Sequence, residues 1–265
     1  MARASDFNGK WALVTGASSG IGVALARELA RRGAKLILTA RRRDRLEALA
    51  EELAGQGTEM RVFPADLLDP EAPAQLLVAV ESEGLAVDIL VNNAGLGQYG
   101  HFVGSPPEQE FAQVRVNCEA AVRLARLFVP GMVERRRGWV LFLASTASFQ
   151  PLPYFATYAA SKAFDRFFAL GLAEEVARFG VKVTALCPGP TESEFFEVSR
   201  AEAFKLRTMQ TPEQVARKAV AGLERGRRMV VPSRDGRLLA FAVRLLPVGW
   251  ITRVVEKMAR PPQSH

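Results

Sequence analysis

The sequence has few of the side chains that build metal sites, disulfide frameworks and histidine catalysis. Its 265 residues include two cysteines, Cys118 and Cys187, and two histidines, His101 and His265. The cysteines lie far apart without a Cys/His cluster around them, which excludes a disulfide framework or a zinc site. One histidine lies in a Gly-rich loop and the other is the last residue, so we expect neither histidine catalysis nor a metal.

Long apolar runs are also missing. No stretch reaches about 18 uninterrupted apolar residues, and residues 1–10 do not resemble a signal sequence. We therefore expect a cytoplasmic protein with no integral membrane span. The net charge is +7, but the arginines lack interleaved aromatics or a recognisable binding motif, so no nucleic-acid partner is expected.

What the sequence does contain is a regular alternation of short apolar runs and longer amphipathic segments. Strands are predicted at 11–15, 36–39, 61–63, 87–91, 139–144, 181–186 and 229–231. Helices are predicted at 21–32, 44–53, 70–83, 107–135, 154–179 and 212–225. This pattern predicts an α/β protein with a seven-stranded parallel sheet covered by helices, the doubly wound Rossmann arrangement. Because no linker divides the chain, we expect one domain over 1–265, with a core at about 9–232 and a helical extension at 235–260.

A glycine-rich turn follows the first predicted strand and leads into the first predicted helix, within Thr15-Gly-Ala-Ser-Ser-Gly-Ile-Gly22. Gly16 allows a sharp exit from the strand, Gly20 lets the backbone approach a pyrophosphate, and Gly22 lets helix and sheet pack closely. The helix N-terminus favours the anion. In this context the turn indicates dinucleotide binding.

The second predicted strand ends at Arg41 and Arg42, about 20 residues beyond the glycines. An NAD site is expected to place an acidic residue here, on the ribose hydroxyls. A guanidinium instead suits bidentate contacts to a 2′-phosphate, which favours NADP(H) over NAD(H). The alternative is that both arginines belong to a solvated helix start.

Tyr158 and Lys162 are four residues apart, so on a helix both side chains leave the same face. An ammonium beside a phenol favours the phenolate and lowers the tyrosine pKa toward the range of acid/base catalysis. Ser145, at the end of the fifth predicted strand, can orient a substrate carbonyl. By itself the pair is also compatible with a solvated helix face.

These residues belong to a longer series of motifs, by which the chain resembles the single-domain branch of the short-chain dehydrogenase/reductase family over nearly its whole length. The series comprises the glycine turn, Asp66, Asn92-Asn93-Ala94-Gly95, Asn117, Ser145, Tyr158, Lys162 and Pro188-Gly189-Pro190-Thr191. The resemblance implies a catalytic tetrad of Asn117, Ser145, Tyr158 and Lys162. In this tetrad tyrosine is the general acid in reduction, lysine holds the nicotinamide ribose, and Asn117 supports a water-linked proton relay.

The resemblance and the glycine turn together give a predicted NADP(H) site. Its residues are Gly16, Ser18, Ser19, Gly20, Ile21, Gly22, Arg41, Arg42, Asp66, Leu67, Asn93, Ala94, Gly95, Tyr158, Lys162, Pro188, Gly189 and Thr191. The predicted reaction interconverts a ketone or aldehyde and an alcohol by hydride transfer. A catalytically silent nucleotide-binding regulator or scaffold on the same fold is the alternative function.

Two apolar segments suggest an apolar small-molecule substrate. A lid at about 190–209 carries Phe195, Phe196, Val198, Phe204 and Leu206, and Phe149, Leu152, Pro153, Tyr154 and Phe155 precede Tyr158. They could instead serve core or subunit packing. A more distant similarity to ketoacyl and 17β-hydroxysteroid reductases points to a 3-ketoacyl, steroid-like or other hydrophobic carbonyl, and the family implies a homodimer or homotetramer.

The segment 238–258 is apolar but interrupted by Arg244, Pro247, Gly249 and Arg253. This segment is too broken to span a bilayer comfortably. We expect it to pack over the pocket or against another subunit; the alternative is peripheral contact with a membrane surface.

Overall fold

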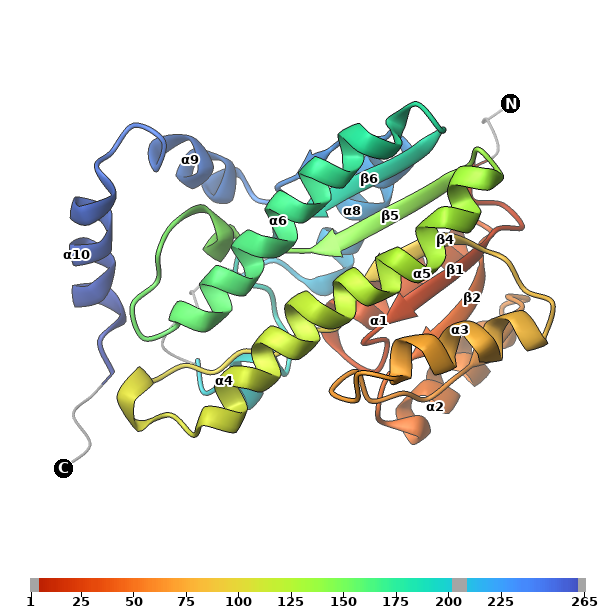
Figure 1. The fold of residues 1–265 in the computed structure, drawn as a ribbon, viewed down its shortest axis with the longest axis horizontal. Helices are drawn as coiled ribbons and strands as arrows, with labels where there is room; N and C mark the ends of the chain where they lie inside the picture. Colours follow the sequence, from red (N-terminus) through yellow and green to blue (C-terminus); the bar gives the residue numbers. More distant parts are fainter. Residues whose placement is uncertain (1–4, 202–208, 262–265) are drawn as a thin grey trace.

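The computed structural model describes residues 5–201 and 209–261, and its centre is a parallel sheet of seven strands (Figure 1). Their order is β3-β2-β1-β4-β5-β6-β7, and every paired strand is parallel. The predicted doubly wound α/β class is therefore confirmed. The strands are β1 (Trp11–Thr15), β2 (Lys35–Thr39), β3 (Met60–Val62), β4 (Val87–Asn92), β5 (Gly138–Leu143), β6 (Val181–Leu186) and β7 (Met229–Val230).

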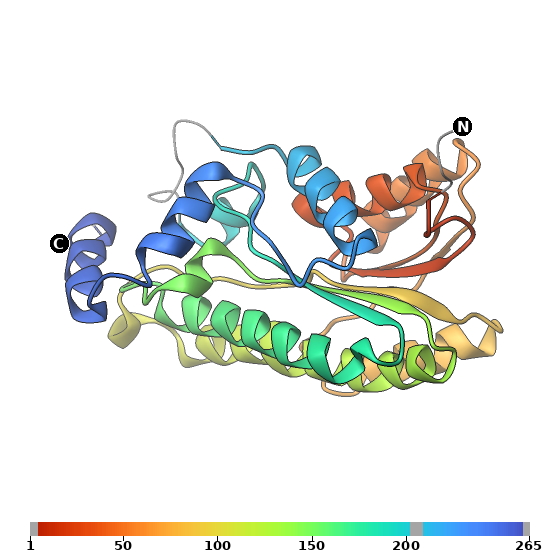
Figure 2. The same ribbon diagram turned by 90° about the horizontal axis from the view of Figure 1, so that it is seen from above.

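Helices cover both faces of the sheet, as Figure 2 shows from the side. On one face the sheet packs against α1 (Gly20–Arg31), α2 (Arg43–Ala54) and α8 (Pro212–Glu224). On the other it packs against α3 (Ala72–Ser82), α5 (Ala120–Glu134) and α6 (Ala156–Ala177). Neighbouring residues of one strand point to opposite faces, so both faces of a strand must be apolar: in β1, Ala12 and Val14 meet the first group of helices and Leu13 meets the second.

The predicted helix at 107–135 is helical throughout but not uniform. It begins as α4 (Pro107–Val114), passes through a π-helical turn, η2 (Arg115–Glu119), and continues as α5. A π turn inserts a residue into the helical ladder, which rotates the side chains around it. The turn contains Asn117, which is 1% exposed.

The predicted helix at 154–179 starts two residues late. Tyr154 has a left-handed backbone, with φ of 63°, and Phe155 has φ of −144°, so α6 can begin only at Ala156. The preceding turn is a short 3₁₀ helix, η3 (Thr146–Phe149), whose N-cap is Ser145.

The strand order reverses between β1 and β4, because β2 and β3 lie on one side of β1 and β4 to β7 lie on the other. Connections that leave in opposite directions open a crevice at the carboxyl ends of these strands. The predicted motif residues Gly16, Asn93 and Ser145 follow β1, β4 and β5, so all three lie at this edge.

The chain ends in two helices, α9 (Arg234–Ala242) and α10 (Val248–Ala259), at the carboxyl-end side of the sheet (Figure 1). The Ser233 side chain caps α9 by accepting a hydrogen bond from the amide of Gly236. Within the described ranges, no helix is both long and apolar enough to cross a membrane.

Candidate active site

One cavity of about 860 Å³ occupies the crevice at the carboxyl ends of the strands. It extends from the glycine turn and Arg42, past Tyr158, to α9 and α10. All eighteen residues of the predicted cofactor site line it, and Ser145 does as well. Asn117 is not among the lining residues.

The glycine turn is shaped by close approaches that leave no room for side chains. A Cβ on Gly16 would lie 2.8 Å from Asn93 Nδ2, and one on Gly22 would collide with the carbonyl oxygen of Gly16. Gly16 and Gly20 have φ of 65° and 53°, a left-handed conformation that favours glycine. The tight turn brings backbone amides and the N-terminus of α1 to the cavity, an arrangement that favours an anion.

Thr15 and Asn93 brace the two strand ends on either side of the crevice. The Thr15 hydroxyl donates to the Val91 carbonyl at 3.1 Å and accepts from the amides of Asn93 and Ala94 at 2.9 and 3.0 Å. Asn93 Nδ2 donates to the Thr15 carbonyl at 2.8 Å. Because both side chains are buried, these bonds hold the glycine turn and residues 93–95 in a fixed relation.

Arg42 approaches the glycine turn, as the sequence predicts, but it also meets an acidic residue of the lid. Its guanidinium lies 3.3 Å from Ser18 Oγ and 3.0 Å from a carboxylate oxygen of Glu194. Arg45 contacts the other Glu194 oxygen at 2.6 Å. These two guanidinium groups hold the pKa of Glu194 below its ordinary value, while Arg41 is exposed at the cavity edge.

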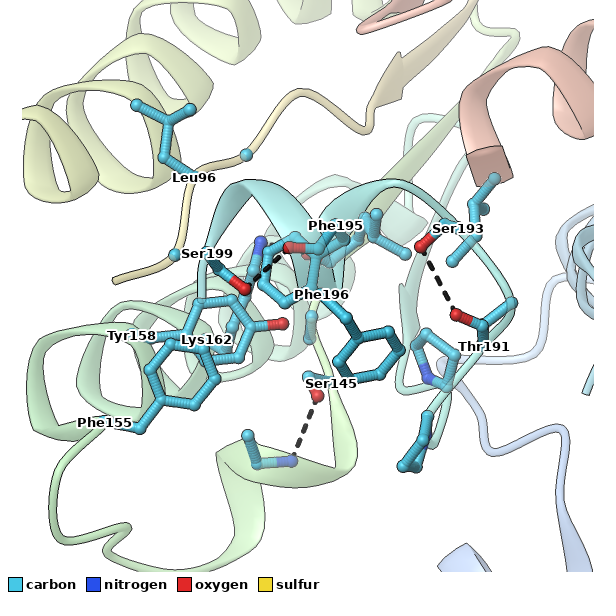
Figure 3. Close-up of a pocket in the computed structure, with 18 of the residues that line it drawn as sticks. Leu96, Ser145, Phe155, Tyr158, Lys162, Thr191, Ser193, Phe195, Phe196 and Ser199 are labelled. Atoms are coloured by element: carbon cyan, nitrogen blue, oxygen red, sulfur yellow. Dashed lines mark hydrogen bonds between the residues drawn. The ribbon is translucent and has the colours of Figure 1, made fainter. Parts of the chain in front are cut away.

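Two aromatic rings pack against Tyr158 (Figure 3). Phe155 stacks on it with a centroid separation of 4.4 Å, and Phe195 of α7 (Phe195–Val198) lies 5.2 Å away. Burial raises the pKa of Tyr158, and the nearby Lys162 charge and Ser145 hydroxyl only partly offset this effect. The predicted lowering by Lys162 is present, but the predicted net direction is wrong, because these rings withdraw the phenol from water.

Lys162 lines the cavity although it is only 3% exposed, and two hydrogen bonds fix its position. Its ammonium donates to the Leu143 carbonyl at 2.6 Å and to Asp165 Oδ2 at 3.0 Å. A Cβ on Gly95 would lie 3.3 Å from both Lys162 Nζ and Asn117 Oδ1, so both side chains approach residue 95 closely.

The Asn117 side chain connects three segments. Its Nδ2 donates to the Leu96 carbonyl at 2.9 Å and to Ser161 Oγ at 2.8 Å, and its Oδ1 accepts from the Leu96 amide at 2.8 Å. These bonds hold the loop after β4 against α6. Asn117 thus lies behind the cavity wall, close to Gly95.

The described part of the predicted lid packs aromatic residues near the Tyr158 ring. Phe195 and Phe196 join Phe155 and Tyr99 in one apolar cluster, which Leu152 and Tyr154 also contact. Val198 lines the cavity but is 69% exposed. The predicted lid residues Phe204 and Leu206 lie outside the described residues.

The C-terminal helices form the far wall of the cavity, with the lining residues Leu239, Ala242, Val243, Leu246, Trp250, Ile251, Val254, Val255, Met258 and Ala259. Two tyrosines attach α10 to the body: Tyr99 donates to the Ala259 carbonyl at 2.7 Å, and Tyr154 donates to Glu256 at 2.5 Å. Together with Tyr158, all three tyrosines of the chain thus lie at or around this site.

Sequence reasoning missed Asp165, Ser161, Glu194 and Glu256. Asp165 had a signal, since it follows Lys162 by three residues on a predicted helix and an acid at that spacing can pair with a lysine. Glu194 lies 152 residues from Arg42 and has no comparable signal. Among the described residues, no cluster of three or more His, Cys, Asp or Glu side chains could hold a metal ion.

Comparisons with known proteins agree with this geometry. Residues 10–203 match the family model of the short chain dehydrogenases. A very-long-chain 3-oxoacyl-CoA reductase of Anas platyrhynchos is 35% identical over 217 residues, which are 80% of this chain and 68% of that protein.

Two solved structures are similar over nearly the full chain. A short-chain dehydrogenase from Sphingobium yanoikuyae in complex with NADPH has a TM-score of 0.81 and 29% identity, covering 97% of this chain and 98% of that one. The bulky-bulky ketone specific alcohol dehydrogenase from Comamonas testosteroni has a TM-score of 0.77 and 27% identity, covering 97% of each. The chain therefore belongs to the short-chain dehydrogenase/reductase family, and it is an oxidoreductase acting on alcohol or carbonyl groups.

Proposed function

We propose that this protein is an NADP(H)-dependent oxidoreductase that interconverts an apolar ketone or aldehyde and its alcohol, with Tyr158 as general acid/base. The observation that carries the proposal is the single cavity in which Tyr158 and Lys162 stand between the glycine turn and an apolar wall. One end suits a dinucleotide and the other an apolar molecule, so the phenol lies where the two would meet.

The residues present fit a nicotinamide dinucleotide. The backbone of the glycine turn can approach a pyrophosphate closely, because its glycines carry no side chains. Asp66, Leu67, Pro188, Gly189 and Thr191 also line the cavity. When bound, the cofactor supplies or accepts a hydride at the carbonyl carbon. The protein's part is to position the reactants and to move a proton.

In the reduction direction, Tyr158 Oη donates its proton to the carbonyl oxygen, on which negative charge develops. Ser145 donates a second hydrogen bond to that oxygen and so orients the carbonyl. The Ser145 hydroxyl oxygen accepts from the Ala147 amide at 3.1 Å, which fixes its place and leaves its proton free to donate. Lys162 places a positive charge near the phenol and keeps an N–H available for the nicotinamide ribose.

NADP(H) is preferred over NAD(H) in this proposal. Support comes from Arg42, which lies beside Ser18 of the glycine turn, and from Arg41 at the cavity edge. No acidic side chain stands at the end of β2, where ribose hydroxyls would need one. The NADPH-bound neighbour from Sphingobium yanoikuyae is consistent with this preference.

The substrate is proposed to be apolar and bulky or long. Aromatic residues of the lid and apolar residues of α9 and α10 line the part of the cavity beyond Tyr158. The similar duck protein is named for very-long-chain 3-oxoacyl-CoA reduction and the similar Comamonas enzyme for bulky ketones, which supports a substrate of this kind.

The test is the substitution Tyr158→Phe, assayed with NADPH against a panel of apolar ketones and aldehydes. Removing the hydroxyl removes the proton donor, so we expect turnover to fall by at least about 100-fold. NADPH binding, measured by fluorescence, should stay within a few-fold of the parent because Lys162 and the glycine turn remain. Unchanged turnover in the variant would reject Tyr158 as the acid.

The same panel separates this proposal from the alternative of a silent nucleotide-binding regulator or scaffold. If the parent protein binds NADPH tightly yet reduces none of the carbonyls and oxidises none of the matching alcohols, the catalytic proposal fails. Running each assay with NADH as well measures the cofactor preference.

A further inference from the structure

Asp165 is a buried carboxylate that the mechanism above does not use. It lies on α6, one turn beyond Lys162, and each of the two residues is 3% exposed. Its Oδ2 is 3.0 Å from Lys162 Nζ. A buried charged pair is costly to form, so its position directly under the proposed catalytic centre calls for a physical account.

We propose that Asp165 is a positioning residue that keeps Lys162 charged and correctly placed inside a dry site. This inference rests on the proposed function. It assigns to Asp165 the task of maintaining the ammonium on which cofactor binding and the field at Tyr158 depend.

The hydrogen bonds of Lys162 show how the placement works. An ammonium has three donors, and here one goes to the Leu143 carbonyl and one to Asp165 Oδ2. Both acceptors lie on the protein side of the ammonium, one at the end of β5 and one on α6. The third donor is therefore left for the cavity, where a ribose hydroxyl and the phenol would lie.

The charge balance shows why a neutral neighbour would not suffice. Burial by itself lowers the pKa of Lys162, because the interior disfavours a charge, but the charge and hydrogen bond of Asp165, together with Tyr158 and Cys118, outweigh this effect and the pKa lies above its ordinary value. The charge of Asp165 is the largest of the contributions that oppose burial, so its removal would lower the pKa of Lys162. Lys162 would then lose its proton in the alkaline range.

Other titratable groups around the pair come from α6 itself and from two further segments. Tyr158 faces it from the same helix, Cys118 from η2 and Cys187 from the end of β6, with Arg166 acting on Cys187. Burial raises the pKa of Cys118 to about 11 and that of Cys187 to about 12, so both thiols stay neutral over the range of the test below. Asp165 is thus the anion nearest to Lys162 among these groups.

The main test uses Asp165→Asn, which keeps an oxygen acceptor and removes the charge. NADPH binding is measured by fluorescence from pH 7 to about 9.5, without substrate, so that turnover is not needed. The parent should bind with nearly constant affinity over this range, while the variant should lose affinity at least about tenfold toward alkaline pH as Lys162 deprotonates. An Asp165→Asn protein with the parent's pH dependence would overturn the proposal.

Asp88→Asn is the matched control. Asp88 is also a buried acid, 6% exposed, and it pairs with Arg137 at 3.2 Å, but it lies on β4 and does not line the cavity. Its substitution should lower thermal stability without changing the pH dependence of NADPH binding. If Asp88→Asn produced the same pH dependence, the effect would be general destabilisation and the proposal would fail.

A stability measurement tests the pair independently of cofactor and turnover, and covers the case in which Asp165→Asn does not fold. Lys162→Met leaves the Asp165 carboxylate buried without its cationic partner, so we expect the melting temperature to fall on the order of 10 °C. The double variant Lys162→Met with Asp165→Leu should regain most of that loss. A double variant no more stable than Lys162→Met alone would contradict the pairing, whereas failure of Tyr158→Phe to lose turnover would reject only the proposed function.

Discussion

At the scale of single residues, the proton of Tyr158 is governed by burial as much as by its charged neighbour. The rings of Phe155 and Phe195 withdraw the phenol from water, which raises its pKa, and Lys162 lowers it less than burial raises it. A tyrosine in this state keeps its proton at neutral pH. A protonated phenol is the form that the proposed role of Tyr158 as general acid requires.

The direction of this shift predicts opposite pH profiles for the two reaction directions. In the proposed mechanism, reduction needs protonated Tyr158, so its kcat should be level near neutral pH and fall as pH rises through the tyrosine pKa. Oxidation needs the phenolate, so its kcat should rise roughly tenfold per pH unit below that pKa. Measuring kcat against pH in both directions with one alcohol and its ketone tests whether the Tyr158 pKa is raised. An oxidation rate independent of pH would contradict this prediction.

At the scale of elements, ion pairs hold the segment leading into α7 against the cofactor end of the cavity. Glu194 bridges Arg42 and Arg45, both of which are partly exposed, so water screens the attraction. The Glu194 carboxylate nevertheless pairs with the Arg42 guanidinium, which we propose as a contact for the 2′-phosphate of NADPH. If NADPH binds as proposed, Glu194 and the cofactor 2′-phosphate would therefore compete for Arg42.

This competition predicts the effect of Glu194→Gln. Removing the carboxylate frees Arg42, so the KM for NADPH should fall about threefold to tenfold while the KM for NADH stays nearly constant. Glu192→Gln is the control, because it removes the same charge from an exposed neighbour that does not line the cavity. Equal changes for NADPH and NADH would show that Glu194 does not act through the 2′-phosphate.

At the scale of the whole molecule, the C-terminal helices complete a cavity that the sheet core leaves open. Eight of the sixteen large apolar side chains that are strongly exposed within the described ranges lie between residues 238 and 258. The inner side of this segment lines the cavity, and Tyr99 and Tyr154 fasten α10 in place. The expected packing over the pocket is thus present, and subunit or membrane contact remains a proposal for the outer side.

The attachment of α10 predicts the effect of Glu256→Gln. Glu256 accepts from Tyr154 and pairs with Arg260, so losing its charge should loosen α10 over the apolar end of the cavity. We expect the KM for a bulky ketone to rise several-fold with little change in the KM for NADPH. Glu175→Gln on α6, an exposed acid that does not line the cavity, serves as the control. A rise confined to the cofactor KM would contradict this role.

The sequence predicted the fold well because its signals are local. Strand and helix periodicities, the glycine turn and the Tyr158/Lys162 spacing all depend on residues near one another in the chain. The π turn that positions Asn117 was not predicted, since its residues continue the helical pattern on either side. Likewise, the late start of α6 depends on the left-handed backbone of Tyr154. Glycine would have signalled this conformation in the sequence, but the residue is a tyrosine.

By itself the sequence determined the parallel sheet, the place of the cofactor turn and the identity of the candidate proton donor, because backbone preferences and side-chain chemistry act locally. Tertiary structure decided how those groups behave. Lys162 found a buried partner in Asp165, Arg42 met Glu194 from a distant segment, and the Tyr158 pKa moved upward rather than downward. The physical reason is that burial and long-range electrostatics depend on which segments the fold brings together.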